Sequence, residues 1–72
     1  MTPLSLELVR LMKAADVSQA GLASMMGVAE STVLRWTTGA ITPGVPRICD
    51  IAEALGVPYA QETLMRAAAV RT

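Results

Sequence analysis

Apolar residues recur along the chain with helical spacing, and glycines and prolines divide it into blocks of helical length. In the first block, one helical face carries apolar residues at i, i+4, i+7 and i+11, namely Leu4, Leu8, Leu11 and Ala15. Thr2 is a favourable N-cap and Pro3 a favourable first helical residue. The pattern therefore predicts a helix that begins at Thr2-Pro3 and ends at Asp16-Val17.

The next two blocks are short and are joined by a very short link. Ser18 is a good N-cap for the second block, and Gly27 follows it where a left-handed residue ends a helix. The residues of this block that should face inward are Leu22, Ala23 and Met26. The third block is predicted over Glu30–Thr38 and ends at Gly39. Its apolar face consists of Val33 and Trp36.

The fourth block spans about Gly44–Leu55 and tolerates Pro46 because the first turn of a helix leaves that backbone nitrogen unbonded. Its predicted inward residues are Val45, Ile48, Ile51, Ala52 and Leu55. The fifth block begins near Pro58 and extends into an Ala-rich tail, Ala67–Val70. Val, Ile and Thr do not alternate over a sustained run, so no strands are expected. The pattern predicts an all-α fold of five short helices.

Length and composition narrow the class of protein. The chain has 72 residues, 53% of them apolar, and a formal net charge of zero. We expect a single domain over residues 1–72, and this hydrophobicity excludes intrinsic disorder. No uncharged stretch reaches the ~18–20 apolar residues of a membrane span, and no secretory signal begins the sequence. A cytoplasmic protein without membrane contact is therefore expected, in a bacterium or a phage-infected cell.

The sequence also excludes most catalytic chemistry. It contains no histidine, so triads built on histidine and histidine-based metal sites are impossible. Cys49 is the single cysteine and can form neither an internal disulfide nor a metal set. There is no Gly-rich phosphate loop. We expect no enzymatic activity, no cofactor, no metal and no small-molecule ligand.

Two helices joined by a turn with a glycine suggest a helix-turn-helix. The more specific pattern is formed by Ser18, Gln19, Leu22, Ala23, Gly27, Val28, Ser31, Thr32, Val33, Trp36, Gly39 and Pro43, followed by Ile48, Ile51, Ala52, Ala54, Leu55, Gly56 and Val57. At this spacing the chain resembles the phage Cro/repressor-type helix-turn-helix family (xenobiotic-response-element-like DNA-binding domains), without gaps, from about Leu4 to Leu64. The resemblance implies a compact, lambda-repressor-like five-helix domain. Its second helix would cross the DNA backbone, and its recognition helix, about residues 29–38, would lie in the major groove.

Two features that are usual in the family are missing. Relatives usually carry Arg at the position of Met12 and Glu at that of Thr37, and these form a partly buried ion pair between helices one and three. Replacing both members of such a pair by packing is often neutral or better, so we expect Met12 to pack near Thr37. The turn after the recognition helix, residues 39–43, lacks the Lys or Arg that relatives often carry.

The resemblance implies a set of DNA-contacting residues, namely Gln19, Glu30, Ser31, Thr32, Arg35, Thr38 and Arg47. Gln19 is expected on the DNA backbone because helix N-termini suit phosphate; the alternative is an exposed polar residue. Arg35 is expected to contact a base, since Arg to guanine is the commonest specific contact; the alternatives are a solvated or phosphate-bound Arg. Glu30 either accepts a hydrogen bond from the N4 amino group of cytosine or only interacts favourably with the positive end of the helix dipole.

The remaining members of the set carry hydroxyl groups or lie near the DNA backbone. Ser31 is expected near a base and Thr32 on a phosphate, although either hydroxyl could bond back to its own helix. Thr38 lies below them on the same face, and Arg47, in the first turn of helix four, is expected near phosphate.

The predicted function is a sequence-specific transcription regulator, a Cro-like repressor that binds double-stranded operator DNA as a homodimer. The alternative is a helix-turn-helix protein-interaction module, antirepressor- or antitoxin-like, with weak or no DNA binding. Zero net charge and the neutral turn favour this alternative, and the polar recognition face opposes it. Apolar residues beyond the needs of one small core are candidates for the dimer contact: Leu6, Val9, Leu64, Met65 and Val70.

Overall fold

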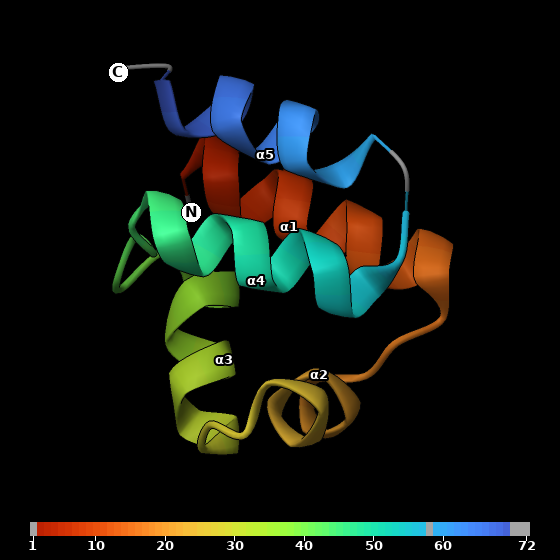
Figure 1. The fold of residues 1–72 in the computed structure, drawn as a ribbon. Coiled ribbons are helices and arrows are strands. Elements are labelled where there is room, and N and C mark those ends of the chain that lie inside the picture. Colours follow the sequence, from red (N-terminus) through yellow and green to blue (C-terminus); the bar gives the residue numbers. More distant parts are fainter. Residues whose placement is uncertain (1, 58, 70–72) are drawn as a thin grey trace.

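The computed structural model describes residues 2–57 and 59–69, which form five α-helices and, within these ranges, no strand (Figure 1). The helices are α1 (Pro3–Ala15), α2 (Gln19–Met26), α3 (Glu30–Thr38), α4 (Val45–Leu55) and α5 (Ala60–Ala69). The predicted all-α helix-turn-helix fold is thereby confirmed. None of these helices is long and apolar enough to cross a membrane, within the part of the chain that the structure describes.

The helix ends follow the capping chemistry expected from the sequence. Thr2 caps α1 through a capping box, in which its side chain and that of Ser5 each accept a hydrogen bond from the other's backbone N–H. The Ser18 hydroxyl accepts from the backbone N–H of Gly21 at 3.0 Å and caps α2. Gly27 ends α2 with φ of 69°, a left-handed conformation that glycine adopts without steric cost. This glycine makes the short turn that brings α3 directly after α2.

One hydrophobic core joins all five helices. Its buried apolar residues are Leu4, Leu8, Leu11, Met12, Leu22, Ala23, Val33, Trp36, Ile48, Ile51, Ala52, Leu55, Ala60 and Leu64. The helices α1, α4 and α5 pack against one another (Figure 1). The helices α2 and α3 form a pair, in which α2 contacts α4 and α3 contacts α1. The pair of the helix-turn-helix therefore rests on a three-helix support.

Two sequence-based expectations about burial were wrong. Val45, predicted to face inward, is 56% exposed because it is the first residue of α4, before the buried stripe begins at Ile48. Leu64, proposed as surplus for a dimer contact, is only 1% exposed and belongs to the core. The fifth helix begins at Ala60; Pro58 and Val70 lie outside the described residues.

Candidate nucleic-acid interface

α3 has one buried side and one exposed side. Val33, Trp36 and Thr37 are buried, with Trp36 only 4% exposed. The exposed residues of the helix are Glu30, Ser31, Leu34, Arg35 and Thr38. These include four of the residues predicted to contact DNA, and the structure places them on the surface of one nine-residue helix. Leu34, 47% exposed, adds an apolar group to this otherwise polar side.

The start of α3 keeps its polar groups available. Ala29, the N-cap residue, has no side chain that could accept a hydrogen bond from the first turn. Among the described residues, the hydroxyls of Ser31 and Thr32 have no hydrogen-bond partner. Thr38, by contrast, donates back to the Arg35 carbonyl oxygen at 3.4 Å. A bond back to its own helix was the alternative raised for Ser31 and Thr32, and none is found for either hydroxyl among the described residues; Thr38, for which it was not raised, makes such a bond.

Gln19 is held by a contact that the sequence pattern did not predict. It is the first residue of α2 and is half-buried. Its Nε2 donates a hydrogen bond to Oγ1 of Thr37 over 3.4 Å, and the Thr37 hydroxyl in turn donates to the Leu34 carbonyl oxygen at 3.0 Å. The sequence analysis placed Thr37 near Met12 but missed its role as the partner of Gln19, and the only signal for Thr37 in the sequence was its departure from the family's usual Glu.

Met12 and Thr37 lie on the same small cavity, as expected for two residues that together replace an ion pair. The cavity has a volume of about 210 Å³ and is lined by Val9, Met12, Lys13, Val17, Ser18, Gln19 and Thr37. Met12 and Thr37 are both nearly inaccessible, at 6% and 5% exposure. At the junction of α1, α2 and α3, the two buried residues thus line a small surface cavity, and one side-chain hydrogen bond, from Gln19 to Thr37, crosses from α2 to α3.

Arg47, near the start of α4, contacts a residue of α3. Its guanidinium carbon lies 5.8 Å from the centroid of the Trp36 ring, within the range of a cation–π contact. Arg47 is nevertheless exposed, so its charge remains accessible from outside. The structure brings Arg47 beside α3 at Trp36, and Gln19 contacts the same helix at Thr37.

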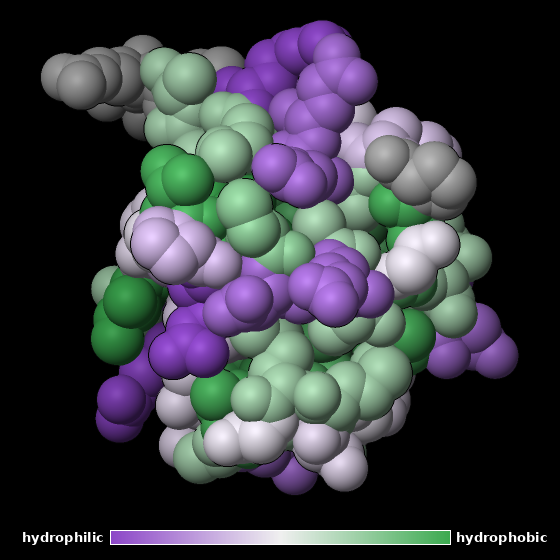
Figure 2. All heavy atoms as spheres, viewed as in Figure 1, coloured by the Kyte–Doolittle hydropathy of each residue, from purple (hydrophilic) through white to green (hydrophobic). Residues whose placement is uncertain are grey.

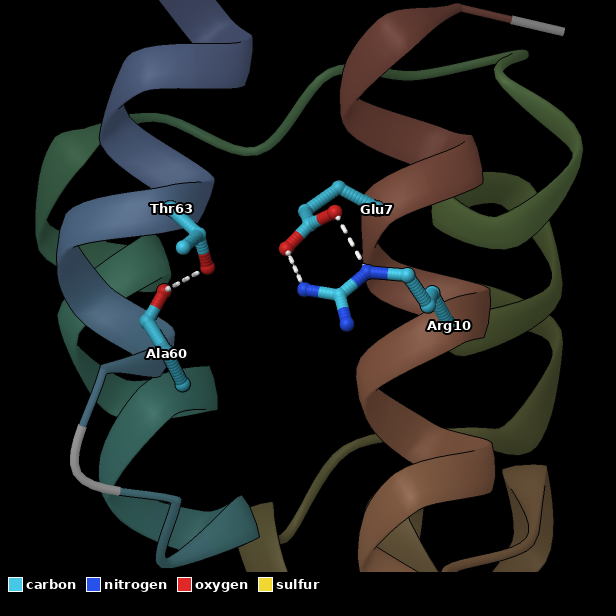
Figure 3. A network of polar contacts seen from close by, with 4 residues as sticks. All are labelled: Glu7, Arg10, Ala60 and Thr63. Carbon is cyan, nitrogen blue, oxygen red and sulfur yellow. Dashed lines mark hydrogen bonds and ion pairs between the residues drawn. The ribbon is translucent and has the colours of Figure 1, made fainter.

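The ion pairs of the described residues lie away from this surface. They join Arg10 to Glu7 on α1 and Arg66 to Glu62 on α5. The Arg10 side chain holds the Glu7 carboxylate on the side of α1 that faces α5 and lowers the pKa of Glu7 (Figure 3). Within residues 17–49 the charged groups are Glu30, Arg35 and Arg47, which leave this segment one positive charge. Among the described residues, none of these three forms an ion pair.

Comparison with known families agrees with this geometry. A family model described as Helix-turn-helix matches residues 8–61, which include α2, the turn at Gly27 and α3. The match covers more than half of the chain, so the protein belongs to the Cro/repressor-type helix-turn-helix family. This is a family of DNA-binding regulatory domains and not a family of enzymes. No curated protein and no solved structure matches the chain.

Proposed function

We propose that the protein is a sequence-specific transcription regulator of the Cro/repressor type that binds operator DNA with α3 in the major groove. The observation that carries this proposal is the division of α3 into a side fixed by Val33 and Trp36 and an exposed polar side without ion pairs among the described residues. Fixing a helix by its apolar side leaves the polar side free to contact base edges. Membership of the helix-turn-helix family supports the same function.

The exposed residues divide into those proposed to contact bases and those proposed to contact the backbone. Arg35 can form a bidentate hydrogen bond with guanine, and Glu30 and Ser31 lie on the same side of the helix. Gln19 and Arg47 flank α3 and are proposed to contact phosphates, which fix position but not sequence. Thr32 and Thr38 are proposed to add hydroxyl groups near the DNA backbone.

We further propose that the regulator is a homodimer, whose two recognition helices lie about 34 Å apart so that they enter successive major grooves. Of the apolar residues predicted for the contact, Leu6 is 55% exposed, and Val9 and Met65 are half-buried. Leu64 is excluded by its place in the core. Sedimentation should show a dimer in the presence of operator DNA. A monomer both with and without DNA would rule out the dimer.

Selection of bound sites from random duplex DNA tests the function directly. The expected result is a palindromic motif, because a two-fold symmetric dimer requires one. On the selected site, Arg35→Ala should cost about 1–3 kcal/mol and relax the preference at one base pair. Gln19→Ala should weaken all sequences alike, and Arg66→Ala on α5 serves as the control for loss of a remote charge. The reverse pattern for Arg35 and Gln19 would show that the proposed orientation of α3 is wrong.

A second candidate function, a protein-interaction module, is favoured by a groove between α2 and α4. Its lining consists of Met25, Met26, Asp50, Glu53 and Ala54, and Met25 is 53% exposed. Figure 2 shows hydrophilic side chains along α4 beside a largely hydrophobic surface over α2. Apolar side chains bordered by carboxylates suit a partner segment that is both basic and apolar. Failure to bind any duplex at low salt would favour this function over the regulator.

A further inference from the structure

The hydrogen bond between Gln19 and Thr37 fixes which end of the Gln19 amide faces the protein. A threonine hydroxyl has one hydrogen and two acceptor lone pairs. The Thr37 hydroxyl hydrogen is directed to the Leu34 carbonyl oxygen at 3.0 Å. Oγ1 can therefore only accept from Gln19, and the group it accepts from is Nε2. The amide nitrogen, and not the amide oxygen, is held against α3.

This orientation matters for an anion at the start of α2. An amide nitrogen carries two hydrogens, and the bond to Thr37 uses one of them. The second hydrogen remains a donor, next to the backbone N–H groups of Gln19 and Ala20, for which the described residues provide no acceptor; the N–H of Gly21 is already taken by the Ser18 hydroxyl. A phosphate oxygen only accepts hydrogen bonds, so it requires the donor end of this side chain.

We infer that Thr37 is a positioning residue, which holds the Gln19 amide in the orientation that donates to a DNA phosphate and so raises affinity without contacting DNA. The inference rests on the proposed DNA-binding function. Thr37 is 5% exposed and hence closed to DNA itself. Gln19 would otherwise lose side-chain rotamer freedom when DNA binds, and a side chain already restrained loses less.

The experiment combines two measurements on the full chain. In the free protein, NMR follows the Gln19 side-chain amide signals in wild type, Thr37→Val and Thr37→Ser. Affinity for the selected duplex is then measured for the same proteins, each also in a Gln19→Ala background. Thr63→Val is the matched control, because the Thr63 hydroxyl makes the same bond back to its own helix, to the Ala60 carbonyl oxygen at 3.2 Å (Figure 3).

Valine has the shape of threonine but offers no acceptor, so Thr37→Val should release the Gln19 amide and shift its signals. It should weaken duplex binding about three- to tenfold, the loss expected for one hydrogen bond. Thr37→Ser should stay within about twofold of wild type, because the acceptor is kept. In the Gln19→Ala background, Thr37→Val should have no further effect. Thermal unfolding verifies that each variant folds, and Thr37→Ala replaces the valine variant if that one does not.

Three outcomes would overturn the inference. Unchanged Gln19 amide signals in Thr37→Val would show that the hydrogen bond does not form. Equal weakening by Thr37→Val with and without Gln19 would show that Thr37 acts through the packing of α3 alone. Affinity unchanged by Thr37→Val would exclude any role in DNA binding. If the NMR result is as expected but the wild type binds no duplex, the hydrogen bond exists and the proposed DNA-binding function is wrong. The role of Thr37 in DNA binding is then ruled out as well.

Discussion

At the scale of single residues, the junction of α1 and α3 shows how this chain manages without the ion pair that is usual at these positions in the family. Met12 and Thr37 are both buried and line one cavity. A buried ion pair must repay the cost of removing two charges from water, whereas an apolar side chain and a bonded hydroxyl have little such cost. The exchange is acceptable only because both charged partners are absent together.

A double-mutant cycle tests this coupling. Thr37→Glu alone should lower the free energy of unfolding, because it places a carboxylate beside Met12 without a matched cation. Met12→Arg with Thr37→Glu should recover most of that loss, as measured by urea unfolding. Lys13 lines the same cavity, so the cycle is repeated with Lys13→Gln to remove the other nearby cation. A double variant no better than the sum of the single changes would show that the two positions are not coupled.

How far single residues could be predicted from the sequence depended on the range of their contacts. The exposed side of α3 was predictable, because two apolar residues at helical spacing, Val33 and Trp36, determine which side is buried. The partner of Gln19 was not, because it lies 18 positions further along the chain and the bond depends on side-chain conformation. The contact of Arg47 with the Trp36 ring was missed for the same reason.

At the scale of helices, α3 is the one helix among α1, α2 and α3 whose N-terminus has no side-chain capping hydrogen bond. Ala29 has the extended backbone of an N-cap residue, φ of −69° and ψ of 146°, but no side-chain acceptor. Ser18, in the same position before α2, accepts a hydrogen bond from Gly21. Ala29→Ser should therefore raise the free energy of unfolding by about 1 kcal/mol.

Chemical denaturation of Ala29→Ser, with Ala40→Ser in the following loop as the control, measures this gain. The control adds the same hydroxyl where no helix begins, so it should leave stability unchanged. Equal stability of the two variants would show that the first turn of α3 is already satisfied by solvent.

The ion pair on α1 predicts how stability changes with pH. Arg10, through its hydrogen bond, lowers the pKa of Glu7, and partial burial of the carboxylate opposes this shift. A carboxyl group whose pKa is lower in the folded protein stabilises it above the unfolded pKa, about 4.3 for Glu. That contribution is lost as the pH falls through the lower, folded value. Glu7→Gln should therefore melt below wild type at neutral pH, and the difference should vanish in acid.

The matched control for this pH series is Glu62→Gln, which removes the exposed pair with Arg66 on α5. Both of its side chains are more than 70% exposed, so solvent screens the interaction and little change is expected at any pH. A difference for Glu7→Gln that persisted below the folded pKa would mean that Glu7 acts through packing instead of charge.

Helix boundaries were predictable where a capping residue marks them. Thr2, Ser18, Gly27 and Gly39 bound α1, α2 and α3 as expected. α5 lacked such a signal, so its start was predicted only as near Pro58, which lies outside the described residues; the described helix begins at Ala60. The role of Leu64 was also missed, because periodicity shows that a residue is apolar but not how many apolar residues five small helices need to close a core.

At the scale of the whole molecule, zero net charge conceals an uneven distribution. The described ion pairs lie on α1 and α5, whereas residues 17–49 carry two arginines and one glutamate. The proposed interface therefore has a small positive charge on a protein that has none overall. Electrostatic attraction supplies nearly all non-specific binding to DNA, so such a protein must obtain most of its affinity from contacts that depend on sequence.

Salt dependence measures this balance. Each neutralised phosphate contributes about −0.9 to the slope of log affinity against log salt. If Arg35 and Arg47 are the cations near DNA in each subunit, and Glu30 opposes them, a dimer neutralises roughly two to four phosphates and the slope is about −2 to −4. Binding is titrated against salt on the selected operator and on random duplex DNA, with Arg66→Ala as the control for a charge outside the interface.

The two duplexes should then behave differently, because base contacts, hydroxyls and backbone amides are less sensitive to salt than ion pairs. The operator should be bound with a shallow slope and a high ratio of specific to non-specific affinity, and random DNA should be bound poorly even at low salt. A steep slope on both duplexes would mean that a basic surface other than Arg35 and Arg47 meets the DNA. Within the proposed regulator, Arg47→Ala should make the operator slope shallower by about one per subunit, whereas Arg66→Ala should leave it unchanged.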